Sequence, residues 1–212
     1  MRTYEPTIFC SVSAISHFYA IFVTMKQILT TIFLLCCTML SIASTSAQEQ
    51  GFNLIVVGDT QPQTEEQITK LESELIPQIA TIVDEYKATG YPTAILLTGD
   101  VVWDNMAFLP RVKADFEALG VPVYAVIGNH DHNRRHQRNQ AKAEQDYIAT
   151  WGSRNQAFML GETLFVTLDN IDYTTYKDYK SDVDSEQLAW LNSVVKQHPD
   201  IERVAVCMHA PA

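Results

Sequence analysis

Short polar clusters carry most of the chemistry that this sequence could perform. GDTQ at 58–61, GD at 99–100 and GNHDH at 128–132 each follow an apolar run, and two further apolar runs end in Asp169-Asn170 and in His209. The carboxylate, amide and imidazole groups of these clusters form a mixed oxygen and nitrogen ligand set. Such a set suits Mn, Fe, Zn or Mg, and it is not a thiolate site. The clusters therefore predict a site for divalent cations.

The elements that must position these clusters alternate between strand and helix. Short apolar runs predict strands at 52–58, 94–97, 121–127, 164–168 and 204–208, the fourth paired with 157–160 across the turn at 161–162. Apolar positions three and four residues apart predict helices at 68–86 and 108–119, weak helicity at 139–151, and a last helix capped by Asp184. Because the carboxyl ends of neighbouring strands converge on one crevice, the polar clusters are expected to meet there.

Two of these helices carry more specific expectations. Pro77 lies within the helix at 68–86 and is expected to bend it, because proline lacks the N–H that a helix interior needs. In the last helix, Gln187 stands three residues after Asp184, which is a capping-box spacing. The apolar residues of that helix expected to face the core are Leu188, Leu191 and Val195.

Composition favours one folded domain of ordinary size. The chain has 212 residues, of which 47% are hydrophobic and 19% charged, so it can bury a sizeable core. Its formal charge of -10 argues against sequence-independent nucleic-acid binding, which needs a basic surface. An acidic protein that handles phosphates is instead expected to use a cation. The sequence has no G-x-S-x-G segment, so a serine hydrolase with a nucleophile elbow is disfavoured.

The N-terminal part is predicted to lie outside the folded domain. Residues 25–47 begin with Lys26, continue in an apolar run from Ile28 to Leu40 and end in small residues, which is the layout of a secretory signal peptide. We therefore expect export of residues 48–212 to the periplasm or the cell exterior, without stable membrane insertion once the signal is cleaved. An uncleaved membrane anchor is the alternative. Residues 1–24 are interpreted as an extension from a start codon assigned too far upstream.

Four blocks of the chain resemble those of the calcineurin-like metallophosphoesterases. They are GDTQ at 58–61, GDVVWDN at 99–105, GNHDH at 128–132 and MHAP at 208–211, and the resemblance runs from about Phe52 to the last residue. The chain is most similar to secreted bacterial members with Gln in the first block and an LDN block, here at 168–170. The resemblance implies an α/β fold of two packed mixed sheets flanked by helices (αββα), with two divalent metal ions at their edge.

The resemblance also implies roles for the metal ligands. Asp59 would bind the first metal, Asp100 would bridge both, and Asn129 and His209 would bind the second. Gln61 stands where the family usually has His, and it is either a neutral oxygen ligand or a hydrogen-bonding partner of a ligand. Two cations held in this way would activate a hydroxide for in-line attack on phosphorus.

Further roles concern the substrate. By resemblance, His130 would lie over the leaving group and Asp131 would orient His130. The residues that could contact the substrate are Asp104, Asn105, His132 and Arg134. For Arg134 a solvated loop is the alternative, and for Asp104 and Asn105 the alternative is a cap on the following helix.

One departure from the family concerns the end of the chain. The Gly-His-x-His block that the family has after the His209 block does not occur here, so the domain at 48–212 is expected to lack two of seven ligand positions and its last strands. We expect a metal-dependent hydrolase of phosphate monoesters or diesters that acts on small molecules. The alternative is a truncated, non-catalytic remnant with an incomplete metal site. Substrate identity, metal identity and oligomeric state are left open.

Overall fold

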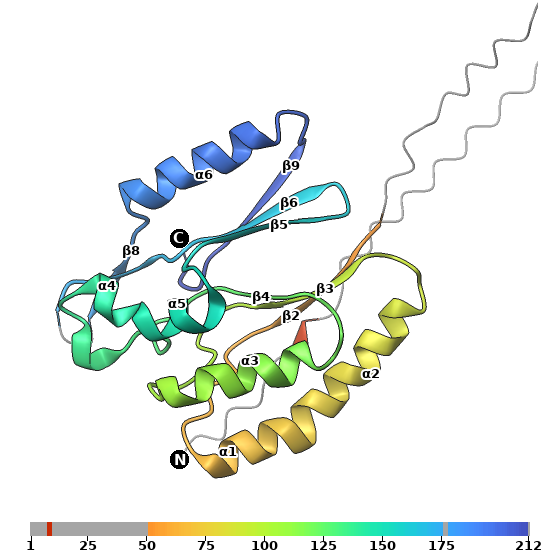
Figure 1. Ribbon diagram of the computed structural model, residues 1–212, viewed down its shortest axis with the longest axis horizontal. Helices are drawn as coiled ribbons and strands as arrows, with labels where there is room; N and C mark the ends of the chain where they lie inside the picture. The colour runs from red at the N-terminus through yellow and green to blue at the C-terminus, as the bar shows by residue number, and fades with distance from the viewer. Residues whose placement is uncertain (1–7, 10–50, 176–177, 212) are drawn as a thin grey trace, which may run out of the picture. The chain divides into compact units, whose positions relative to one another are not determined.

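The computed structural model describes residues 8–9, 51–175 and 178–211 (Figure 1). The segments predicted as an upstream extension and a signal peptide lie outside these ranges, apart from β1 (Ile8–Phe9). This short strand pairs antiparallel with β2. In the part of the chain that the structure describes, no helix combines the length and the apolar character needed to cross a bilayer.

The first half of the chain builds a largely parallel sheet. Its strands are β2 (Asn53–Val57), β3 (Thr93–Leu97) and β4 (Val123–Ala125), in the spatial order β1-β2-β3-β4. All five residues of β3 are buried, as expected for a central parallel strand covered on both faces. The predicted strand at 121–127 has a ladder of only three residues, although Pro122 and Val126 still bond to β3 at either end.

Helices cover one face of this sheet (Figure 1). They are α1 (Glu65–Lys70), a π-helical segment (Leu71–Leu75), α2 (Ile76–Lys87) and α3 (Leu109–Glu117). Thr64 caps α1 in a capping box with Gln67. The predicted bend at Pro77 takes the form of the π-helical turn just before it, where the proline leaves one helical hydrogen bond unmade.

The second half builds another sheet. β5 (Gln156–Leu160) and β6 (Thr163–Thr167) form the predicted hairpin, and β9 (Arg203–Cys207) runs parallel to β6. A separate two-stranded ribbon consists of β7 (Ile171–Tyr173) and β8 (Tyr179–Ser181). The predicted helix at 139–151 is divided at Glu144 into α4 (Gln140–Ala143) and α5 (Gln145–Trp151).

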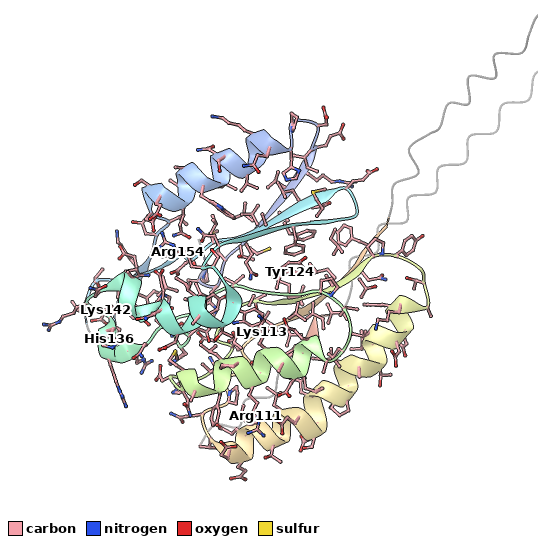
Figure 2. All side chains as sticks on the ribbon, in the orientation of Figure 1. Arg111, Lys113, Tyr124, His136, Lys142 and Arg154 are labelled. Atoms are coloured by element: carbon pink, nitrogen blue, oxygen red, sulfur yellow. The ribbon has the colours of Figure 1, made fainter. Side chains whose placement is uncertain are left out.

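The two sheets pack face to face and helices lie outside both. Phe52, Leu54 and Tyr124 of the first sheet pack against Phe158 and Phe165 of the second, and Tyr124 is labelled between the sheets in Figure 2. α6 (Ser185–Gln197) lies on the far side of the second sheet. The predicted αββα architecture is therefore confirmed.

The predicted inner face of α6 is wrong in part. Leu188 and Val195 are 46% and 37% exposed, whereas Gln187 and Val194 are buried. Asp184 caps the helix as predicted, but the Gln187 side chain also reaches the backbone of Asp169, which draws this polar residue inward. The buried stripe of α6 is consequently displaced by one position from the one that the apolar pattern indicates.

Candidate metal centre

Three predicted ligands meet at the carboxyl ends of their strands. Asp59 follows β2, Asp100 follows β3 and His209 follows β9, so both sheets contribute. Each offers a ligand atom, and these atoms all lie within 4.8 Å of one another. A ligand cluster at this edge is the usual outcome when neighbouring strands end together.

The backbone around this cluster is strained. In the described part of the chain, positive φ at non-glycine residues occurs only at Asp59 (42°), Gln61 (43°), Asp100 (51°) and Asp104 (54°). Side chains rarely adopt this region, and each such residue costs of order 1–3 kcal/mol. All four lie in the two loops that follow β2 and β3, so the strained residues are in the loops that orient the predicted ligands Asp59 and Asp100.

Glycines permit the close approach of these loops. A Cβ at Gly128 would clash with the backbone nitrogen and carboxylate of Asp100, and a Cβ at Gly99 would clash with the His209 ring. Gly99 also has a φ of 98°, which side chains rarely adopt. The predicted sharp turns thus need glycine at 99 and 128, while Gly58 keeps a negative φ.

The imidazole of His209 is oriented for ligation. Its Nδ1 lies 2.9 Å from the carbonyl oxygen of Thr98, so in the neutral ring the proton is on Nδ1 and Nε2 carries a lone pair. Metal-binding histidines typically donate their other N–H in this way. Nε2 in turn faces two oxygens, Asn129 Oδ1 at 3.2 Å and Asp100 Oδ1 at 3.4 Å. The Nε2 lone pair of His209 and the side-chain oxygens of Asn129 and Asp100 thus face one another, and a cation could bind to all three.

The carboxylates support the same interpretation. Burial raises the pKa of Asp59, and the nearby negative charge of Asp100 raises it further. A bound divalent cation would reverse the second effect, because it attracts both carboxylates. Asp59, Asp100, Asn129 and His209 therefore fit a divalent cation by donor chemistry and by orientation.

Gln61 makes hydrogen bonds to Asp100. Its side-chain Nε2 donates to Asp100 Oδ2 at 2.6 Å, and its backbone N–H donates to the Asp100 carbonyl at 3.1 Å. Gln61 is therefore a hydrogen-bonding partner of the Asp100 carboxylate in this structure, and ligation by its side-chain oxygen stays a prediction. The Gln61 amide thus holds the carboxylate that is expected to bridge two metals.

His130 lies beside this cluster, held by Trp103 and Asp104 from the loop after β3 and by Arg134 from the connection that follows His130 itself. Its ring stacks on Trp103 with centroids 3.8 Å apart, and its Nδ1 lies 2.9 Å from Asp104 Oδ1. Arg134 places Nε 2.8 Å from the same carboxylate oxygen and Nη2 3.0 Å from the imidazole Nδ1. Asp104 and Arg134, predicted only as substrate contacts, therefore also position His130.

The prediction that Asp131 orients His130 is wrong. Asp131 is fully buried, and its carboxylate accepts from the backbone N–H groups of Gly128 at 2.9 Å and Val102 at 3.0 Å. Burial, followed by the charge of Asp100, raises its pKa to about 7. Successive side chains of this turn point in different directions, so Asp131 braces the loop from inside while His130 faces the cluster.

The prediction that His132 contacts substrate is also wrong. Its side chain is fully buried, with Nδ1 2.9 Å from the Gly128 carbonyl oxygen and Nε2 3.1 Å from Asp169 Oδ2.

Two other predicted substrate contacts, Asp104 and Asn105, follow β3. Asn105 donates from its side-chain Nδ2 to the carbonyl of Gln63 at 3.1 Å. Sequence reasoning missed the positioning role of Asp104, since a separation of 26 residues from His130 leaves no local signal.

Comparison with known proteins gives one family. Residues 52–212 match the family model described as calcineurin-like phosphoesterase. A search of curated proteins found no match. Among solved structures, the chain is similar to a purple acid phosphatase from the seeds of yellow lupin (Lupinus luteus), with a TM-score of 0.45 and 11% identity. That alignment covers 68% of this chain and 27% of the lupin chain.

Proposed function

The chain belongs to the calcineurin-like phosphoesterase family, and from this premise we propose that it hydrolyses small-molecule phosphate esters with two divalent metal ions. One observation carries the proposal: Asn129 Oδ1 and Asp100 Oδ1 lie 3.2 and 3.4 Å from His209 Nε2, so in the neutral ring three acceptor atoms face one another. A cation bound among these acceptors would supply the positive charge that this arrangement needs.

Four residues of the chain would supply the metal ligands. Asp59 and Asp100 supply carboxylates, and His209 supplies Nε2 because Thr98 engages its Nδ1. Asn129 supplies Oδ1. Bound divalent cations supply Lewis acidity, which lowers the pKa of water and neutralises charge on phosphoryl oxygens.

His130 acts at the leaving group. Asp104 engages Nδ1 and Trp103 covers one face of the ring, so the imidazole keeps one orientation. Arg134 Nη2, which can only donate, also lies 3.0 Å from Nδ1, and when Nδ1 accepts from it the neutral ring carries its proton on Nε2, where it can protonate the departing alkoxide oxygen. Arg134 adds a positive charge beside the ring that attracts the anionic substrate to this edge.

Export is part of the proposal. The charge and apolar pattern at 25–47 supports secretion, with residues 48–212 as the working domain. N-terminal sequencing of protein recovered outside the cytoplasm is expected to begin near residue 48. Protein that retains residues 25–47 in the membrane fraction would support the anchor instead.

The activity test compares metals and substrates. The metal-stripped full chain is assayed with p-nitrophenyl phosphate and with bis-p-nitrophenyl phosphate, in Mn, Fe, Zn or Mg. We expect hydrolysis of one of them only after a metal is restored, and none by Asp100→Asn. Hydrolysis that survives both changes would overturn the proposal. Metal uptake without hydrolysis would instead favour a non-catalytic domain.

A further inference from the structure

The Asp169-Asn170 turn is a deeply buried polar feature outside the proposed metal centre. It follows β6, and its two side chains are only 2% and 1% exposed. Aspartate and asparagine are rarely buried to this extent unless their polar atoms are bonded. The proposed hydrolysis assigns neither residue a role, so their partners are informative.

Asn170 holds the loop that carries His209. Its Oδ1 accepts from the Ala210 N–H at 3.1 Å and its Nδ2 donates to the Ala210 carbonyl at 2.8 Å. A side-chain amide bonded to both polar groups of one residue fixes that residue in position and orientation. Ala210 directly follows His209, so the backbone of this ligand is restrained on its C-terminal side.

Asp169 holds the loop that carries Asn129 and His130. Its Oδ2 lies 3.1 Å from His132 Nε2, and His132 Nδ1 lies 2.9 Å from the carbonyl oxygen of Gly128. Each ring nitrogen faces an acceptor, and the imidazole donates to both when it carries two protons, while Nε2 also lies 3.2 Å from the Gln140 amide nitrogen. Asp169 is thereby linked through one side chain to the residue just before Asn129.

Two glutamines hold the Asp169-Asn170 turn itself by hydrogen bonds. Gln187 of α6 accepts from the Asp169 N–H and donates to the Asp169 carbonyl, both at 2.8 Å. Gln140 donates to Asp169 Oδ2 at 3.2 Å and to the carbonyl of Ile171 at 3.1 Å. An anchored turn can impose a position on the two loops that it contacts.

We propose that Asp169 and Asn170 are positioning residues that set the separation of the two metal loops, 128–132 after β4 and 208–211 after β9. This inference rests on the proposed function for its catalytic consequence. The two loops follow strands of different sheets, so no ladder hydrogen bonds fix their relative position. A displacement of about 1 Å at a reacting centre can cost about 100-fold in rate, which makes such a link consequential.

The test uses an isosteric change, a truncation and a matched control. Asn170→Asp places an acceptor opposite the Ala210 carbonyl, Asn170→Ala removes both bonds, and Asp169→Asn removes the charge facing His132. The control is Gln156→Ala. Gln156 also bridges two main-chain groups, accepting from Ala125 N–H at 3.1 Å and donating to the Trp151 carbonyl at 3.3 Å, but touches neither loop.

The first readout is amide hydrogen exchange of the metal-free full chain. We expect faster exchange at 208–211 in both Asn170 variants and at 128–132 in Asp169→Asn, with neither change in the control. The second readout is Mn(II) affinity by calorimetry, where we expect a loss of about 10-fold or more in the turn variants. The control is expected to stay within about 2-fold of the unaltered chain, because it leaves both loops in place.

The outcomes separate the two proposals. Exchange and Mn(II) affinity that match the control in all turn variants would overturn the positioning role, whatever the activity of the unaltered chain. If exchange changes as expected but the unaltered chain neither binds Mn(II) nor hydrolyses phosphate esters, the loop link is supported and the proposed function fails. Should Asn170→Ala not fold, Asn170→Asp decides, because it preserves shape and one hydrogen bond.

Discussion

Two clusters in this molecule contain the same ionisable groups but differ in how their charges are compensated. Asp59, Asp100 and His209 form one, and His132, Glu144 and Asp169 form the other. Each has two carboxylates and one imidazole, with ligand atoms within 4.8 Å of one another. The first cluster is partly open to solvent, whereas all three residues of the second are buried.

The buried cluster already contains its own positive charge and donors. Arg154, labelled between α5 and the second sheet in Figure 2, lies 3.3 Å from Glu144. Burial lowers the pKa of His132, but the hydrogen bond and charge of Asp169 outweigh it, so the net shift is upward. Gln140 adds a further donor to Asp169.

Among the described residues, the open cluster lacks an arginine like the one beside Glu144, although the Gln61 amide and the His130 backbone N–H donate to Asp100. At its centre His209 Nε2 faces Asp100 and Asn129, and no arginine or lysine of the described residues pairs with Asp59 or Asp100. Residue type alone therefore does not distinguish a metal site from a structural charge network. The difference lies in whether an arginine of the protein compensates the carboxylates, as Arg154 does for Glu144.

The largest expected effect separates the clusters by function. Asp100→Asn is expected to lower metal-dependent phosphate ester hydrolysis by more than about 100-fold. Loss of a residue that only hydrogen-bonds to a metal ligand costs about 10- to 100-fold, and loss of a ligand carboxylate should cost more. Glu144→Gln in the other cluster should leave Mn(II) affinity within about 2-fold. Calorimetric titration and steady-state rates measure both. Equal losses in the two variants would erase the distinction between the clusters.

The next effect concerns stability. Arg154→Met removes the cation beside Glu144, which is 3% exposed, and is expected to lower the free energy of unfolding by about 3 kcal/mol. Arg203→Met is the control, because Arg203 lies at the same 3.3 Å from Glu162 but its side chain is 50% exposed. It should cost less than about 1 kcal/mol. Urea unfolding measures both, and similar costs would contradict the buried role.

A third prediction concerns His130, which lies beside the open cluster and is held by Asp104. Asp104→Asn weakens the hold on His130 and is expected to lower kcat by about 10-fold, part of the roughly 10²–10⁴ that a general acid supplies. The loss should be larger for an alkyl phosphate than for p-nitrophenyl phosphate, because a poorer leaving group needs the proton more. Asn105→Ala is the neighbouring control. Equal losses with both leaving groups would argue against proton transfer by His130.

The smallest expected effect is a pH dependence of the buried cluster. The raised pKa of His132 means that its pairing with Asp169 stabilises the fold fully below about pH 6.5, the unfolded value. That contribution is lost as pH rises through the folded pKa. Urea unfolding at a series of pH values should show stability falling above about pH 6.5 and a flatter profile in Asp169→Asn. Identical profiles would contradict a charged His132.

Much of the architecture could be predicted because it depends on local patterns. Apolar runs and turn residues identified the strands, and Gly99-Asp100 and His209 were recognised at the ends of theirs. Strand ends in such sheets converge whatever the loops do, so the meeting of Asp59, Asp100 and His209 followed from the pattern.

The individual roles around that site could not be predicted in the same way. His130 and His132 are two positions apart, yet one lies beside the open cluster and the other is buried against Asp169. Asp131 faces backbone N–H groups, while Asp104, 26 residues before His130, pairs with the imidazole. Leu188 and Val195 became exposed because Gln187 turns toward the same buried aspartate.

The sequence by itself determined the fold class, the strand ends and the residue types that meet there, since these follow from hydrophobic periodicity and turn chemistry within short segments. Only the tertiary structure decided which charges are compensated. Arg154 meets Glu144, and His132 meets Asp169 from 37 residues away, whereas Asp59 and Asp100 have no arginine or lysine partner among the described residues. Charge compensation depends on distances between side chains brought together by folding, and no local pattern encodes those distances.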